Sequence, residues 1–271
     1  SLMSDIPSPD HNPEEAPDNS PAAWLRDVKA AAIFFTRVPL VHEGVLTLAD
    51  LRRAWRAVPA SGALVGLAGG IVFAAAAWLG LPPAGAALLA VLATVALTGA
   101  LHEDGLADVA DGLGGEDAER RIEIMRDSRI GAYGALALIF SVGLRASALT
   151  AIARPGAAIL ALIAAHAVSR ACVPAVMDRI PPATEEGLGS SAGTPDRTAL
   201  AIAAGSALVI ALVVLGPAAG VWSLIAAAAA AFAVAAMAQR LFRGYTGDVL
   251  GAVQQAAEIA VLLAAAASFA A

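Results

Sequence analysis

The sequence of 271 residues is poor in charged, aromatic and cysteine residues. Charged residues make up only 15% of the chain, whereas a soluble globular protein carries roughly 25%. Hydrophobic residues make up 59%, and the mean hydropathy is +0.73. This composition argues against a water-soluble domain and favours a chain whose helices lie in a lipid bilayer.

These shortages also exclude several classes of function. The single cysteine, Cys172, cannot form an intramolecular disulfide and has no second thiol with which to hold zinc. Aromatic residues make up 5% and the formal net charge is −6, so a basic, aromatic surface for nucleic acid is not available. The sequence also contains no Walker phosphate-binding loop. We therefore expect no nucleic-acid partner and no ATPase activity.

The first residues differ in composition from the rest of the chain. Residues 1–21 contain five prolines and several acidic side chains but few large apolar ones, which is typical of a disordered tail. Ser1 and Leu2 precede Met3 and look like a cloning scar, and the tail lacks the pattern of a signal peptide. Residues 22–36 have an amphipathic pattern, which predicts a short helix along the cytoplasmic membrane interface.

From Ala57 onward, long apolar stretches alternate with short polar connections. About 20 helical residues are needed to cross the hydrocarbon core of a bilayer. Seven stretches have about that length, within a range of six to eight; they are residues 57–79, 83–101, 131–153, 156–177, 199–216, 218–238 and 249–271. The sequence thus predicts an all-α, polytopic integral membrane bundle, with residues 22–271 forming a single transmembrane domain.

The basic residues predict how this bundle is oriented. Nearly all of them lie before the first span or in alternate connections, at residues 102–130, 178–198 and 239–248. The other connections contain only Arg154. Because cytoplasmic connections accumulate Lys and Arg, the N-terminus is expected on the cytoplasmic side.

The connection after the second predicted span is rich in acidic residues. Asp104, Asp108 and Asp111 have helical spacing and would project within about 60° of one another, while Glu103 would lie a quarter-turn away. Carboxylates this close repel one another unless a cation lies between them, and oxygen ligands suit Mg²⁺ or Mn²⁺ carrying a substrate phosphate. The alternative interpretation is a solvated acidic loop.

Two further segments lie on the same predicted side. Residues 124–134 contain Arg126, Ser128 and Arg129, which could hold phosphate oxygens or could simply be a basic flank of the next span.

The second segment begins at Gly244. In it, Asp248 and Glu258 could complete a second metal site; the alternative is a capped turn into the last span.

The predicted spans before the last one contain the ionisable residues Arg145, His166 and Arg170. Such residues are costly in a membrane and are expected to face the interior of the bundle or a water-filled cavity. His166 and Arg170 could reach an anionic substrate, or they could make helix-to-helix hydrogen bonds or snorkel to the interface.

Several of these motifs resemble those of the cobalamin synthases, or adenosylcobinamide-GDP ribazoletransferases. The resemblance rests on residues 35–39 (FTRVP), 102–112 (HEDGLADVADG), 124–134 (IMRDSRIGAYG), 169–170 (SR) and 244–248 (GYTGD). It implies a polytopic inner-membrane enzyme with a cytoplasmic active site, so that residues 22–271 form a transmembrane catalytic domain. It also implies Mg²⁺ as the cofactor.

The same resemblance implies a reaction. The cobinamide phosphate of adenosylcobinamide-GDP is transferred to α-ribazole or α-ribazole 5′-phosphate, and GMP is released. For this chemistry we assign Glu103, Asp104, Asp108 and Asp111 as metal ligands, and leave open whether one of them or Asp248 is the general base. The candidates for substrate binding are Arg37, Arg126, Ser128, Arg129, His166 and Arg170.

Two other functions are weighed against this one. Residues 108–112 match the start of the CDP-alcohol phosphotransferase signature, but Gly115 and Glu116 stand where that signature has Ala and Arg. A secondary transporter would explain charges inside the spans, yet the acidic residues gather at one face of the membrane and not near its midplane. The spacing of Gly62, Gly66 and Gly70 allows close helix packing either within the chain or between copies in a homo-oligomer.

Overall fold

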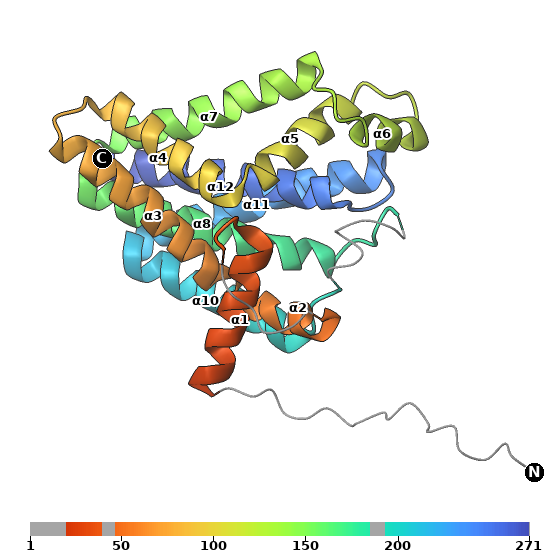
Figure 1. Cartoon of the computed structure of the whole chain (residues 1–271), viewed down its shortest axis with the longest axis horizontal. Helices are drawn as coiled ribbons and strands as arrows, with labels where there is room; N and C mark the ends of the chain where they lie inside the picture. The colour runs from red at the N-terminus through yellow and green to blue at the C-terminus, as the bar shows by residue number, and fades with distance from the viewer. Residues whose placement is uncertain (1–19, 40–46, 185–192, 271) are drawn as a thin grey trace, which may run out of the picture.

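The computed structural model describes residues 20–39, 47–184 and 193–270. The predicted N-terminal tail therefore lies almost wholly outside the described residues. Where the chain is described it is helical, and it contains no β-strand. The prediction of an all-α protein is confirmed (Figure 1).

The helices in the described residues form a shorter and a longer group. The shorter ones are α1 (Pro21–Phe35), α2 (Leu48–Ala54), the 3₁₀ turn η1 (Trp55–Ala57), α5 (Leu101–Gly112) and α6 (Ala118–Met125). The longer ones are α3 (Val58–Trp78), α4 (Pro83–Thr98), α7 (Ala132–Ile152), α8 (Pro155–Met177), α10 (Arg197–Leu215), α11 (Pro217–Leu241) and α12 (Gly247–Ala270).

The longer helices form a polytopic membrane bundle. Among the described residues, six helices are long and apolar enough to cross a membrane, and a seventh span is reached if α4 and α5 count as one. This agrees with the predicted range of six to eight. One boundary is corrected: the predicted span at residues 83–101 stops at Thr98, and α5 then turns away by 92°.

Helices α8 and α12 lie in the middle of the bundle, and α3 packs closely on α8 (Figure 1). Gly62, Gly66 and Gly70 of α3 make this close approach possible. A Cβ atom added to Gly66 would lie only 2.2 Å from the carbonyl oxygen of Leu162 in α8, and one added to Gly70 would lie 2.7 Å from Ile159 Cα. The glycine spacing is therefore used within the chain, and it no longer argues for a homo-oligomer.

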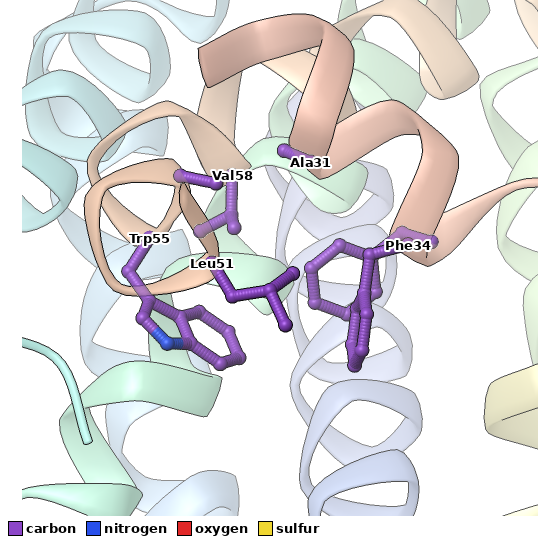
Figure 2. A pocket seen from close by; sticks show the side chains of 7 residues that line it. Ala31, Phe34, Leu51, Trp55 and Val58 are labelled. Atoms are coloured by element: carbon purple, nitrogen blue, oxygen red, sulfur yellow. The ribbon is translucent and has the colours of Figure 1, made fainter. Parts of the chain in front are cut away.

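Helix α1 is amphipathic, as the sequence predicts, and its buried face packs on the start of the bundle. Asp27 on this face accepts a hydrogen bond from Arg56 Nε at 2.6 Å, and the Arg56 guanidinium lies 4.8 Å from the ring centre of Trp24. Figure 2 shows an apolar pocket beside this contact, in which side chains of α1 face those of α2 and η1. At the end of α1, Phe35 stacks on His102 of α5 with ring centres 5.7 Å apart.

Replacing Gly66 with alanine should destabilise the protein, because the added methyl group would collide with the backbone of α8. Overpacking of this kind costs about 1–3 kcal/mol. The measurement is the thermal unfolding midpoint in detergent, with Gly143→Ala as the matched control. Gly143 is also inside a helix, but nothing lies within 4 Å of its added Cβ. Equal midpoints for the two variants would contradict the close α3–α8 packing.

Candidate active site

The acidic helix α5 begins at a sharp break in the chain. Gly99 and Ala100 both adopt left-handed backbone angles, with φ of 65° and 57°, and they separate α4 from α5. Two such residues end one helix and start the next in a new direction. The break is covered by Arg37, whose backbone N–H donates to Leu97 O at 2.8 Å. A Cβ atom on Gly99 would lie 2.5 Å from the Arg37 side chain, so glycine is required there for space as well as for its φ angle.

Helix α5 presents Asp104, Asp108 and Asp111 away from the apolar core. Asp104 is exposed, and Asp108 and Asp111 are half-buried, whereas His102 and Glu103 point inward. The side-chain directions of the three aspartates follow the helical spacing on which the prediction rests. Glu103, a quarter-turn away, is only 6% exposed.

The first turn of α12 lies against the same helix. Gly105 of α5 contacts the backbone of Asp248 so closely that a Cβ atom on Gly105 would lie 2.7 Å from Asp248 O. The negative charge of Asp108 is repelled by Asp248, Asp104 and Asp111. Asp248 also accepts a hydrogen bond from Thr246 Oγ1 at 3.4 Å. We call Asp104, Asp108 and Asp248 the carboxylate face.

The carboxylate face alone does not enclose a metal ion. In the part of the chain that the structure describes, no three His, Cys, Asp or Glu side chains are grouped closely enough to do so. Mg²⁺ commonly keeps several waters and uses one or two carboxylates together with substrate phosphates. The donor chemistry of the carboxylate face therefore fits a magnesium ion that is shared with a phosphate-bearing substrate.

Asp111 is predicted as a metal ligand, but the structure uses both of its oxygens to cap α7. Gly131 N donates to Asp111 Oδ2 at 2.7 Å, and Gly134 N donates to Oδ1 at 2.9 Å. The first N–H groups of a helix have no partner within the helix, and they favour a negative charge. The structure thus ties the last turn of α5 to the first turn of α7.

Glu103 is likewise predicted as a metal ligand and lies elsewhere. Its Oε1 accepts a hydrogen bond from Arg145 Nη1 of α7 at 2.9 Å, inside the bundle. A buried carboxylate needs a cation or several donors, and Arg145 provides the cation. The structure therefore separates Glu103 from the carboxylate face.

The second metal site predicted from Asp248 and Glu258 does not form. The two residues are ten positions apart on α12, which corresponds to about 15 Å along a helix. Glu258 is 1% exposed, and it contacts Arg145 Nη1 at 3.2 Å and His166 Nδ1 at 3.2 Å. Its partners are side chains of the core.

His166 and Arg170 are predicted to bind substrate, to bond between helices or to snorkel to the interface. They are 2% and 0% exposed, and His166 Nδ1 lies 3.2 Å from Glu258 Oε2 of α12, which is a contact between helices. Arg170 Nη1 lies 2.8 Å from His166 Nδ1 and donates to His166 O at 3.2 Å, both within α8. The structure does not bring either side chain to the carboxylate face.

The remaining predicted substrate-binding residues are exposed near the two ends of α5. Arg37 lies at the break before α5, and Arg126, Ser128 and Arg129 lie between α6 and α7. Arg129 donates to Asp127 through Nε at 3.0 Å, and these hydrogen bonds lower the pKa of Asp127 to about 2. Among the described residues, Arg126 forms no ion pair, so its charge is available to an anionic ligand.

Sequence reasoning missed the contacts that hold α5 in place. The partners Glu103 and Arg145 are 42 residues apart, and Asp111 bonds to an amide 20 residues away. The sequence did indicate that such contacts were needed, because a glutamate on the apolar side of α5 and an arginine inside a span both require partners. The sequence does not state which residues pair.

The chain was also compared with known proteins. The family described as cobalamin-5-phosphate synthase matches residues 27–266. No solved structure matches the chain.

Curated relatives cover a similar share of the chain. The adenosylcobinamide-GDP ribazoletransferase of Bradyrhizobium diazoefficiens is 49% identical over 244 residues, which cover 90% of this chain and 94% of that protein. Proteins of the same name from Azorhizobium caulinodans and Mesorhizobium japonicum are each 46% identical, covering 88% and 91% of this chain and 94% and 95% of the relatives. These matches include every element of the carboxylate face. The chain therefore belongs to the cobalamin-5-phosphate synthase family.

Proposed function

We propose that this protein transfers the cobinamide phosphate of adenosylcobinamide-GDP to α-ribazole or α-ribazole 5′-phosphate. The products are adenosylcobalamin, or its 5′-phosphate, and GMP. The observation that carries the proposal is the likeness, over about nine-tenths of the chain, to proteins named adenosylcobinamide-GDP ribazoletransferase. This likeness favours the proposal over a CDP-alcohol phosphotransferase or a secondary transporter.

The reaction breaks the phosphoanhydride bond of the diphosphate and forms a new phosphate ester bond. A ribose hydroxyl of the ribazole attacks the phosphorus that carries the cobinamide, and the bond from that phosphorus to the oxygen of the GMP group breaks. The hydroxyl proton passes to a carboxylate, and negative charge develops on the departing GMP. The protein must therefore offer a proton acceptor and positive charge beside a diphosphate.

The described residues supply these functions around α5. Asp104 and Asp108 would hold Mg²⁺ together with the diphosphate, and the ion would neutralise charge on the phosphate oxygens. Asp248 is a candidate for the general base because its carboxylate adjoins Asp108 but belongs to another helix. Arg126 and Arg37, which are exposed, would bind phosphate oxygens, and Ser128 and Arg129 follow Arg126 in the same connection.

We further propose that the N-terminus and the carboxylate face lie on the cytoplasmic side of the inner membrane. The ends of α4, α8 and α11, and the starts of α7, α10 and α12, adjoin connections in which the basic residues are concentrated. The charged substrate adenosylcobinamide-GDP would reach the carboxylate face from that side.

Asp104→Asn and Asp108→Asn should each lower the rate of GMP release by at least about 100-fold, since each variant removes a charged oxygen ligand. The assay uses the purified protein in lipid, with adenosylcobinamide-GDP and α-ribazole 5′-phosphate, and with Mg²⁺ or a chelator. Asp178→Asn, at an exposed aspartate after α8, is the matched control and should retain activity. Absence of GMP release by the wild type would contradict the proposed reaction, and undiminished release by both variants would contradict the role of the carboxylates.

Asp111→Ala should act on stability more than on metal use, because its oxygens cap α7. Loss of such a cap costs about 0.5–2 kcal/mol. The unfolding midpoint should fall, while the Mg²⁺ concentration that gives half-maximal activity should stay within about threefold of the wild-type value. A tenfold higher Mg²⁺ requirement would instead make Asp111 a metal ligand.

A further inference from the structure

A cluster of buried polar side chains joins four helices beneath the carboxylate face. We call this cluster the buried polar network, and it includes Glu103, Ser141, Arg145, Gln254, Gln255 and Glu258. Each is 6% exposed or less. They belong to α5, α7 and α12, and the side chain of Gln254 also donates to Ser169 of α8 at 3.0 Å.

Arg145 is at the centre of the buried polar network. Its Nη1 atom donates both to Glu103 Oε1 of α5 at 2.9 Å and to Glu258 Oε1 of α12 at 3.2 Å. A single nitrogen of α7 thus links the two helices that carry the carboxylate face.

Neutral side chains complete the connection. Gln255 Nε2 donates to Glu103 Oε1 at 3.2 Å, and Gln255 Oε1 accepts from Ser141 Oγ at 2.8 Å. Gln254 Nε2 donates to Glu258 Oε2 at 2.7 Å. Both glutamates are therefore held by donors from more than one side chain.

Stability alone does not account for these charges. Replacing a buried ion pair with apolar side chains of similar volume is often neutral or stabilising, and charges within a membrane bundle are costly to bury. An apolar contact between α5, α7 and α12 would join the helices at lower cost. A directional role, in which the charges fix one geometry, explains why the charged side chains are used.

The start of α5 needs such a constraint. The helix follows two left-handed residues, and Ala100 provides no side-chain cap. Glu103 immediately precedes Asp104, so the contact of Glu103 with Arg145 sets the rotation of α5 about its own axis. At a side-chain radius of about 5–6 Å, a rotation of 10° moves a carboxylate by about 1 Å. A displacement of that size can reduce a catalytic rate about 100-fold.

We propose that Arg145 is a positioning residue for the transfer reaction: by holding Glu103 and Glu258, it sets the rotation of α5 relative to α12 and so brings Asp104 and Asp108 beside Asp248. This role rests on the proposed function. Arg145 is 1% exposed and would act through Glu103 and Glu258.

The test compares Arg145→Met with Arg145→Lys and with a control in another buried ion pair. Because one nitrogen makes both contacts, a lysine ammonium can replace part of the linkage, whereas methionine cannot. Arg56→Met is the matched control, since Arg56 is 4% exposed and pairs with Asp27 away from α5. Arg145→Met leaves two glutamates without this partner, so a double variant, Glu103→Gln with Arg145→Met, is used if the single variant does not fold. It removes one charge of each sign and leaves Glu258 beside His166 and Arg170.

Two readouts separate positioning from general stability. The first is amide hydrogen exchange of residues 101–112 in lipid, which is independent of catalysis. We expect at least tenfold faster exchange in Arg145→Met and in the double variant than in the wild type or Arg56→Met. The second is the rate of GMP release, which should fall about 100-fold in the same two variants and recover at least tenfold in Arg145→Lys.

The outcomes distinguish this role from the proposed function. Wild-type exchange and wild-type rates in a folded Arg145→Met or double variant would overturn the positioning role while leaving the proposed function intact. Equally faster exchange in Arg56→Met would also overturn it, because a general loss of stability would then explain the effect. If the wild type released no GMP, the proposed function would be wrong, and the exchange of residues 101–112 would still decide whether Arg145 holds α5.

Discussion

The contact of Arg145 with Glu103 and Glu258 is the constraint on which the arrangement of this site depends. It occurs where an acidic helix meets an apolar bundle, and it allows one side of α5 to be buried while the other presents aspartates. Burial of Glu103 without a cation would be strongly unfavourable. The inward contact and the outward carboxylates are therefore two consequences of the same helix orientation.

The rest of the bundle makes that orientation possible. Close packing of α3 on α8 through small residues builds a compact centre, and α12 lies beside α8 with its polar side chains directed into the core. The break at Gly99 and Ala100 then turns α5 out of line with α4. Asp111 attaches the far end of α5 to α7, so that both ends of the acidic helix are anchored to the same neighbour.

Much of this fold could be predicted from the sequence, because the physics of a membrane span is local. Length, hydropathy and the distribution of basic residues indicated about seven spans, and helical spacing placed Asp104 and Asp108 on one side of α5. The break after Thr98 was missed, since an apolar run gives no sign of a bend made by two left-handed residues. The core contacts of Glu103, Glu258, His166 and Arg170 could not be predicted for a related reason. Each carries a chemical group suited to a ligand site, but its tertiary neighbours, which lie far away in the chain, direct it into the core.

Binding of Mn²⁺ by the protein in lipid would show whether the carboxylate face holds a divalent ion together with the substrate diphosphate. Electron paramagnetic resonance would follow the free ion during a titration, with and without adenosylcobinamide-GDP, for the wild type and for Asp108→Asn. We expect the substrate to tighten Mn²⁺ binding in the wild type, and the variant to bind the ion at least about tenfold more weakly. Equal Mn²⁺ affinity in the wild type and Asp108→Asn, with the substrate present, would contradict a divalent-ion site at the carboxylate face.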